Sequence, residues 1–190
     1  RIKEMNLDGA KLLWRWVPTG EKNDRYALET MERVAKAVEE CAELNLPVFV
    51  EPLPMLKTEN GYKTDLRTDN IIKAVGIGSA LGYYTGHLWL KIPYCEDFAR
   101  VAKATTCPVL LLGGESTGRP SGTIEDFVRG MGAGPNIRGA LVGRNVLFCG
   151  EDDPAAIAEA INLVVHQGAS AIDAIHEARK VRGTKLDLFR

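Results

Sequence analysis

Residues 88–93 read LWLKIP, and this stretch decides how the chain is expected to fold. It is a short apolar run closed by a proline, and Lys91 is its one charged residue. A charged side chain inside a buried parallel strand is costly unless it is paired or functional. Alternation along a strand places Trp89 and Lys91 on one face and the aliphatic residues on the other. We expect the aliphatic face to meet helices, so Lys91 should point away from them, into the core of the sheet.

The same pattern of apolar strand, turn and amphipathic helix recurs along the chain. It predicts strands at residues 10–16, 47–51, 88–92, 108–112 and 140–142. The predicted helices open near Asn23 or Asp24, near Asp69, before Phe98, at an N-cap Thr123, at Asp153-Pro154 and at Ser170, and residues 55–67 are predicted to be a polar loop. Strands that alternate with helices indicate βαβ units and a parallel sheet.

Five such strands fit either an open doubly wound sheet or a (β/α)8 barrel. Neither GxGxxG nor GxxxxGK[ST] follows the first strand, so the nucleotide-binding versions of the open sheet lose their main support. A complete barrel has eight strands and typically about 250 residues. We therefore predict an α/β TIM barrel of which this chain carries about strands four to eight. Residues 1–190 are predicted to be one domain whose N-terminal strands are missing.

Composition excludes several classes of protein. The net charge of −1 gives no strong field for nucleic acid or an anionic membrane, and no apolar run is long enough to span a bilayer. The cysteines lack CxxC spacing and the histidines stand apart from them, so we expect no metal site, no cofactor and a reducing, cytoplasmic setting. These residues are Cys41, Cys95, Cys107, Cys149, His87, His166 and His176. We also expect a homo-oligomer.

Chemistry in such folds sits at the carboxyl ends of the parallel strands, where the first three predicted strands supply Lys11, Arg15, Glu51 and Lys91. Lys11 and Arg15 share a strand face and would place two positive charges near Lys91. Neighbouring cations and desolvation favour the neutral amine that attacks a carbonyl. Glu51 would either shuttle protons or hold a lysine in position. For each of these residues a purely structural ion pair is the alternative.

The last two predicted strands end in glycines: Gly113-Gly114, followed by Ser116, and Gly143, followed by Arg144. Glycine has no Cβ, so backbone N–H groups can approach an anion closely, and an arginine adds a charge-assisted hydrogen bond. In barrels these positions commonly form a phosphate site. We predict that they bind the phosphate of a substrate, although a Gly-Gly pair is also an ordinary turn.

Taken in order, the segments AKLLWRW, LPVFVEP, WLKIPY, CPVLLLGGES and ALVGRNVLF resemble the class I aldolase superfamily of deoxyribose-phosphate, fructose-bisphosphate and tagatose-bisphosphate aldolases. They are most similar to its Cgl0159-like branch, from about residue 8 to residue 165. The resemblance implies that Lys91 is the Schiff-base lysine and that Lys11 and Glu51 accompany it. It also implies a phosphate or sulfonate site at the glycines and Arg144. A bulky first strand and a long loop at residues 113–122 depart from the family pattern and leave the substrate open.

The resemblance thus implies a lyase that cleaves or forms a C–C bond in a phosphorylated sugar or sugar acid. Inositol or carbohydrate catabolism is the expected setting, with 2-deoxy-5-keto-gluconate 6-phosphate as a candidate substrate. A non-catalytic barrel that binds a phosphorylated metabolite, as a sensor or accessory domain, is the main alternative. A metal-dependent aldolase or epimerase is disfavoured, because no histidine cluster falls at the predicted strand ends.

Overall fold

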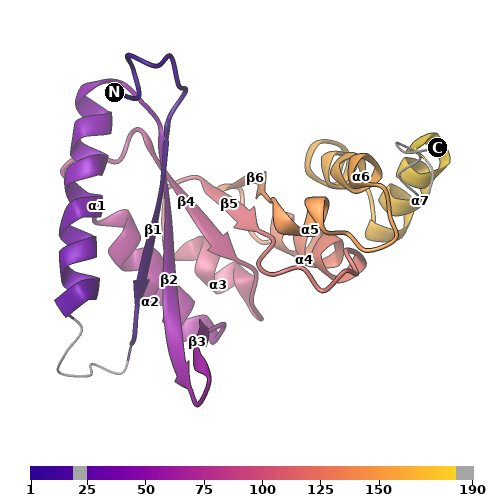
Figure 1. Cartoon of the computed structure of the whole chain (residues 1–190), viewed down its shortest axis with the longest axis horizontal. Coiled ribbons are helices and arrows are strands. Elements are labelled where there is room, and N and C mark those ends of the chain that lie inside the picture. The colour runs from indigo at the N-terminus through magenta and orange to yellow at the C-terminus, as the bar shows by residue number, and fades with distance from the viewer. Residues whose placement is uncertain (19–24, 183–190) are drawn as a thin grey trace. The chain divides into compact units, whose positions relative to one another are not determined.

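The computed structural model describes residues 1–18 and 25–182, which form two compact units, Arg1–Val109 and Leu110–Arg190. Up to residue 141, strands alternate with helices as predicted, apart from one additional strand at Gly61–Thr64, and three consecutive helices follow in the described chain (Figure 1). None of the helices in these residues has the length and apolar character needed to cross a membrane. The elements are β1 (Ala10–Trp16), α1 (Arg25–Glu43), β2 (Val48–Thr58), β3 (Gly61–Thr64), α2 (Thr68–Ser79), β4 (Leu88–Pro93), α3 (Phe98–Lys103), β5 (Val109–Leu112), α4 (Ser121–Met131), β6 (Ile137–Leu141), α5 (Arg144–Leu147), α6 (Pro154–Gln167) and α7 (Ala171–Arg182).

In the first unit, β1, β2 and β4 form a parallel sheet in that order. The register places Lys11 opposite Phe49, and Phe49 opposite Trp89. Each parallel pair is joined by a crossover that contains a helix, α1 or α2, as parallel strands require. The predicted βαβ units are therefore present.

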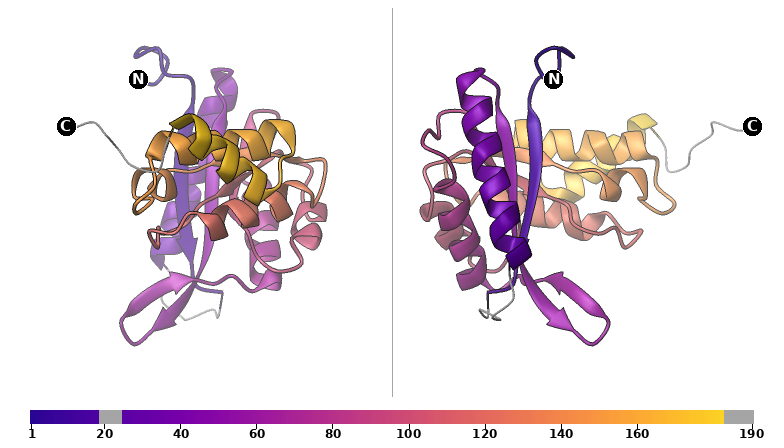
Figure 2. Two further views of the ribbon diagram at one scale, coloured as in Figure 1. Left: turned by 90° about the vertical axis from the view of Figure 1, so that its right-hand side faces the viewer. Right: turned by 60° about the vertical axis from the view of Figure 1, so that its left-hand side comes forward.

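Helices α1 and α2 cover one face of this sheet (Figure 2). Trp14 of β1 is buried, and its indole N–H donates to the carbonyl oxygen of Ala27 in α1 at 2.9 Å. On α2, a Cβ at Gly78 would lie 3.0 Å from Pro52 and 3.3 Å from Leu90, so glycine allows the helix to approach the sheet closely. Strand residues of the other parity face away from these helices. We call that side of the sheet the inner face.

The prediction of a polar loop at residues 55–67 is wrong. Strand β2 continues through Pro52 and Pro54 to Thr58 and pairs with β3 as an antiparallel hairpin (Figure 2). Prolines argue against a central strand because they donate no hydrogen bond. Here, however, the pairing of β2 with β4 ends at Val50, before the first proline. The carbonyl oxygen of Pro54 still accepts the N–H of Asp65 at 2.8 Å, which closes the hairpin.

Helix starts were predicted with mixed success. The Thr123 N-cap is wrong, because α4 begins two residues earlier, at Ser121. The Asp153 cap of α6 is confirmed: its side chain accepts the N–H of Ala155 at 2.8 Å. The start predicted at residues 23–24 lies outside the described residues.

In the second unit, β6 is the neighbour of β5, whose residues from Leu110 onward belong to this unit. Leu111 is fully buried against Gly130 of α4, where a Cβ would come within 2.7 Å of its side chain. The strand predicted at residues 140–142 is in fact Ile137–Leu141. Its start was missed because Arg138 interrupts the apolar run, although the side chain of Arg138 is exposed and the strand simply alternates.

Candidate active site

Lys91 lies on β4, between two fully buried residues, Leu90 and Ile92, that face the helices. Its own side chain is on the inner face and is 17% exposed. The Nζ atom donates a hydrogen bond to Oε2 of Glu51 at 3.0 Å. The orientation that strand alternation predicted for this lysine is therefore present in the structure, and Glu51 is its hydrogen-bond partner.

One carboxylate oxygen of Glu51 forms ion pairs with two lysines. Its Oε2 atom lies 2.6 Å from Nζ of Lys11 and 3.0 Å from Nζ of Lys91, and the side chain is only 10% exposed. Burial acts to raise the pKa of Glu51, but the hydrogen bonds and charges of Lys11 and Lys91 outweigh it and hold the pKa below its usual range. The carboxylate is consequently ionised at neutral pH. We call these three residues the lysine–glutamate cluster.

The strand register explains how the side chain of Lys11 reaches the carboxylate of Glu51. Lys11 is opposite Phe49, two residues before Glu51, so its four-carbon chain extends along the sheet to reach the carboxylate. Phe49 also pairs with Trp89, and their rings are tilted with centroids 5.9 Å apart. Two of the three paired residues in the layer of the inner face before Lys91 are therefore aromatic, and the third is Lys11.

Arg15, the other predicted cation of the first unit, lies on the same strand face as Lys11. Its backbone is opposite Leu53, farther toward the carboxyl ends of the strands, and its side chain is exposed. That position suits contact with an anionic ligand that arrives from solvent.

The strand ends that carry the predicted glycines meet in the second unit, where Gly113-Gly114 follows β5 and Gly143 follows β6. A Cβ at Gly113 would lie 2.6 Å from the side chain of Val142 and 2.9 Å from Nδ2 of Asn145. Gly114 has a φ of +68°, which other residues rarely adopt. The two strand ends can therefore approach each other only because Gly113 has no side chain.

Asn145 is a site residue that sequence analysis did not single out. It is buried, and its side-chain amide donates to the carbonyl oxygen of Gly113, which ties the two strand ends together. The usable signal was its place in the chain, directly behind the Gly143-Arg144 pair. A buried amide must be hydrogen-bonded, so a partner at the neighbouring strand end could have been expected.

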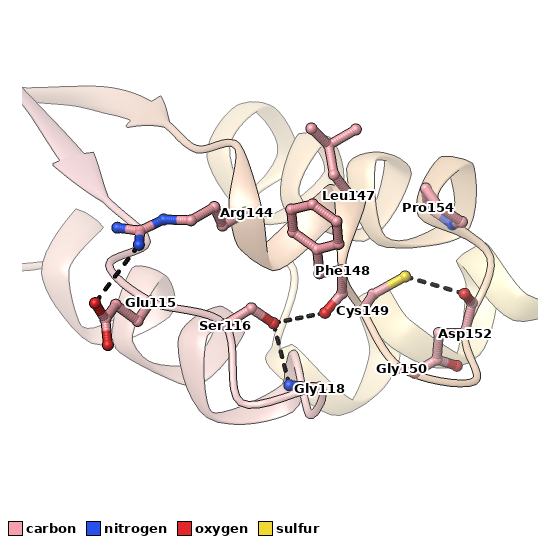
Figure 3. Close-up of a pocket in the computed structure, with 10 residues that line it drawn as sticks. All are labelled: Glu115, Ser116, Gly118, Arg144, Leu147, Phe148, Cys149, Gly150, Asp152 and Pro154. Atoms are coloured by element: carbon pink, nitrogen blue, oxygen red, sulfur yellow. Dashed lines mark hydrogen bonds and ion pairs between the residues drawn. The ribbon is translucent and has the colours of Figure 1, made fainter.

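An open cavity of about 660 Å³ lies in the second unit (Figure 3). Its walls come from the loop after β5, from α5 and from the loop that follows α5. The lining residues are Glu115, Ser116, Gly118, Arg144, Leu147, Phe148, Cys149, Gly150, Asp152 and Pro154. The cavity therefore includes two of the predicted phosphate-binding residues, Ser116 and Arg144.

The hydroxyl of Ser116 is already engaged inside the protein. Its Oγ donates to the carbonyl oxygen of Phe148 and accepts the N–H of Gly118 at 3.1 Å (Figure 3). Arg144 has a looser partner, since its Nη1 is 3.6 Å from Oε1 of Glu115. A ligand in the cavity would therefore meet Arg144 more readily than the Ser116 hydroxyl.

In the part of the chain that the structure describes, no three His, Cys, Asp or Glu side chains are grouped so that they could hold a metal ion. His87 precedes β4 and packs edge-on against Tyr84, with centroids 5.7 Å apart. The cysteines are free and buried, and burial raises the pKa of Cys41, Cys95 and Cys149.

Comparison with known proteins identifies the fold. The family model described as Cgl0159-like matches residues 1–163. The crystal structure of Cgl0159 from Corynebacterium glutamicum is 33% identical, with a TM-score of 0.79 over 88% of this chain and 55% of that chain. An archaeal fructose-1,6-bisphosphate aldolase, solved with its catalytic Lys covalently bound to the carbinolamine intermediate of the substrate, is 21% identical. Its TM-score is 0.66, over 86% of this chain and 60% of that chain.

A curated enzyme is also similar to this chain in sequence. The enzyme 2-amino-3,7-dideoxy-D-threo-hept-6-ulosonate synthase 1 of Archaeoglobus fulgidus is 26% identical over 73% of this chain and 47% of its own length. The described residues are thus part of an aldolase-type TIM barrel, which confirms the predicted fold class. The chain spans about half the length of the relatives that it matches.

Proposed function

This chain belongs to the Cgl0159-like family, and we propose that it is a class I aldolase in which Lys91 forms a Schiff base with a phosphorylated sugar or sugar acid. One observation carries the proposal: the amine of Lys91 lies on the inner face, partly open to solvent, 3.0 Å from an ionised carboxylate. The covalently bound Lys of the archaeal aldolase that shares the fold supports it.

The chemistry begins with the loss of one proton from Lys91. The neutral amine adds to the substrate carbonyl carbon, and the carbinolamine hydroxyl then leaves as water to give an iminium ion. A base removes the proton of the hydroxyl group on the leaving carbon and the C–C bond breaks. Its electron pair moves into the iminium to form an enamine, while the leaving fragment becomes an aldehyde. Protonation of the enamine and addition of water release the second product and restore the lysine.

In this scheme Glu51 exchanges a proton with Lys91, and Lys11 keeps the carboxylate paired. The carboxylate is the nearest acceptor for the proton of Lys91 and the nearest group that can return it to the leaving hydroxyl. Lys11 is the closer of the two lysines to Glu51, at 2.6 Å. Once Glu51 has returned the proton, it is again a carboxylate, and Lys11 stays paired with it while the Lys91 nitrogen is uncharged in the enamine, which avoids a lone buried carboxylate. We assign Lys11 as a positioning residue.

The anionic part of the substrate is assigned to the strand ends of the second unit. Arg144 supplies the charge there. At Gly114 and Gly143 a Cβ would meet nothing within 4 Å, which leaves room for an anion to approach their backbone N–H groups, whereas Gly113 serves to let the two strand ends pack together. Arg15 is the second candidate cation, in the first unit. Its exposed side chain would make a weaker, water-exposed contact.

Reduction with borohydride tests the proposal. The purified protein is incubated with dihydroxyacetone phosphate, fructose 1,6-bisphosphate or 2-deoxy-5-keto-gluconate 6-phosphate, and any Schiff base is then reduced. The mass of the intact protein is measured by mass spectrometry. We expect a stable adduct with at least one of them in the wild type and none in Lys91→Ala. Binding of these compounds without any adduct would favour the non-catalytic barrel instead.

A further inference from the structure

The cavity of the second unit presents a matched pair of opposite charges to any ligand. Arg144 and Glu115 extend toward each other at one end of the group of lining residues, with Nη1 and Oε1 3.6 Å apart (Figure 3). The two side chains are 58% and 89% exposed, respectively, so the pair is held loosely. A ligand can displace Glu115 from Arg144, but it cannot remove the negative charge from the cavity.

The loop that carries Glu115 contacts the segment that follows α5. Ser116, the next residue, is hydrogen-bonded to Phe148 and Gly118 as described above. A Cβ at Gly150 would collide with the carbonyl oxygen of Gly118, so the loop also lies backbone to backbone against the segment after α5. The carboxylate of Glu115 can turn about its own side-chain bonds, but its backbone stays at the cavity.

The other acidic residue of the lining does not share this role. Both carboxylate oxygens of Asp152 accept hydrogen bonds from Arg179, at 2.8 and 2.7 Å, and the Asp152 side chain is 12% exposed. Its charge is therefore neutralised. Arg144 and Glu115 are left as the two lining charges that a ligand meets, and their sum is zero.

Because the charges of Arg144 and Glu115 cancel, the charge of an anion affects how tightly it binds in the cavity. The attraction of a ligand to Arg144 and its repulsion by Glu115 both grow in proportion to the ligand charge, so a second negative charge gains little net Coulomb energy. The hydration that the anion gives up grows with the square of its charge, as in the Born description of ion transfer. A singly charged group therefore keeps its hydrogen bonds to Arg144 at a much smaller desolvation cost than a dianion does.

We propose that Glu115 is a specificity-determining residue, which makes Arg144 select a singly charged group, such as a carboxylate, over a phosphate dianion. The inference rests on the proposed function, because it takes Arg144 as the residue that binds the anionic part of the substrate. It narrows the substrate to one whose Arg144-bound end carries one negative charge, as the carboxylate end of a sugar acid does.

Two probes of similar shape test this selection. Sulfate and methanesulfonate both present tetrahedral sulfur with anionic oxygens, but their charges are fixed at two and one near neutral pH. Their dissociation constants are measured at low ionic strength by NMR, from the side-chain Nε–H signal of Arg144, which is assigned by its loss in Arg144→Ala. The proteins are the wild type, Glu115→Gln and a control, Glu125→Gln. The control removes the same charge from a carboxylate that pairs with Arg129 in the same unit.

We expect the wild type to bind methanesulfonate at least as tightly as sulfate. In Glu115→Gln, sulfate should bind roughly tenfold tighter and methanesulfonate roughly threefold, from the Coulomb repulsion of charges about 5 Å apart near water. Glu125→Gln should match the wild type. Tighter binding of sulfate in the wild type, or equal gains for both anions in Glu115→Gln, would overturn the inference. If neither anion moves the Arg144 signal, the anion site itself is wrong, whereas adduct formation at Lys91 still tests the aldolase chemistry.

Discussion

The two candidate regions pair carboxylates with cations in opposite ways. In the first unit, Glu51 is 10% exposed and accepts Lys11 and Lys91 at 2.6 and 3.0 Å. In the second unit, Glu115 is 89% exposed and lies 3.6 Å from Arg144. Away from water each charge interacts more strongly, and an unpaired charge costs more. The buried cluster is therefore set before a ligand arrives and suits chemistry, whereas the exposed pair can rearrange around a ligand and suits recognition.

The largest effect that this contrast predicts is on turnover. Lys91→Ala should reduce aldol cleavage by roughly 10³-fold or more, because Lys91 is the residue proposed to form the covalent intermediate. Lys11→Ala should lower the rate without abolishing it, because Glu51 keeps one lysine. The rates are compared at equal concentrations of folded protein. Retained turnover in folded Lys91→Ala would contradict the assignment, and complete loss only in Lys11→Ala would move the nucleophile to β1.

A second effect is on stability, and it depends on both lysines. Either Lys11→Ala or Lys91→Ala leaves Glu51 with one partner, so each should cost about 1 kcal/mol. The double variant leaves a buried carboxylate unpaired and should cost roughly 3–5 kcal/mol. Urea unfolding measures all three, and Glu51→Gln in the double variant should recover most of the loss. Strictly additive single costs would show that the three groups do not act as one cluster.

A smaller effect on stability is expected at the start of α2, where a buried carboxylate, Asp65, precedes the helix and an exposed one, Asp69, lies in its first turn. Asp65 is buried and binds the backbone and side chain of Arg67 and the side chain of Asn70, which together lower its pKa from 3.8 to about 2. Asp69 is exposed and pairs with Arg100. Asp65→Asn should cost about 1–2 kcal/mol, after allowance for the exposed side chain of Arg67, and Asp69→Asn a few tenths.

The pH dependence of the Asp65 effect has a definite sign. A pKa that is lower in the folded state stabilises the protein above the unfolded value and loses this effect as pH falls through the folded value. The difference between wild type and Asp65→Asn should therefore be constant above about pH 4 and shrink between pH 4 and pH 2. A difference that does not change over that range would mean that the ionised carboxylate is not what stabilises this turn.

Sequence alone could predict the first region better than the second. Strand alternation is a strict two-residue period, so the face on which Lys91 lies followed from its apolar neighbours. The hairpin after Glu51 was missed because Pro52 and Pro54 are unusual in a paired strand, and nothing local indicates that the β4 ladder ends before them. In the second region, the meeting of Glu115 with Arg144 depends on how two loops fold against each other. Loops have no period from which such a contact can be deduced.

The site of covalent attachment tests the central claim most directly. After borohydride reduction with the substrate that forms an adduct, the protein is digested with trypsin, which does not cleave after a modified lysine. We predict that the added mass lies on the uncleaved peptide of residues 74–100, which contains Lys91 as its one internal lysine. The same mass on the peptide of residues 4–15, which contains Lys11, would contradict the account.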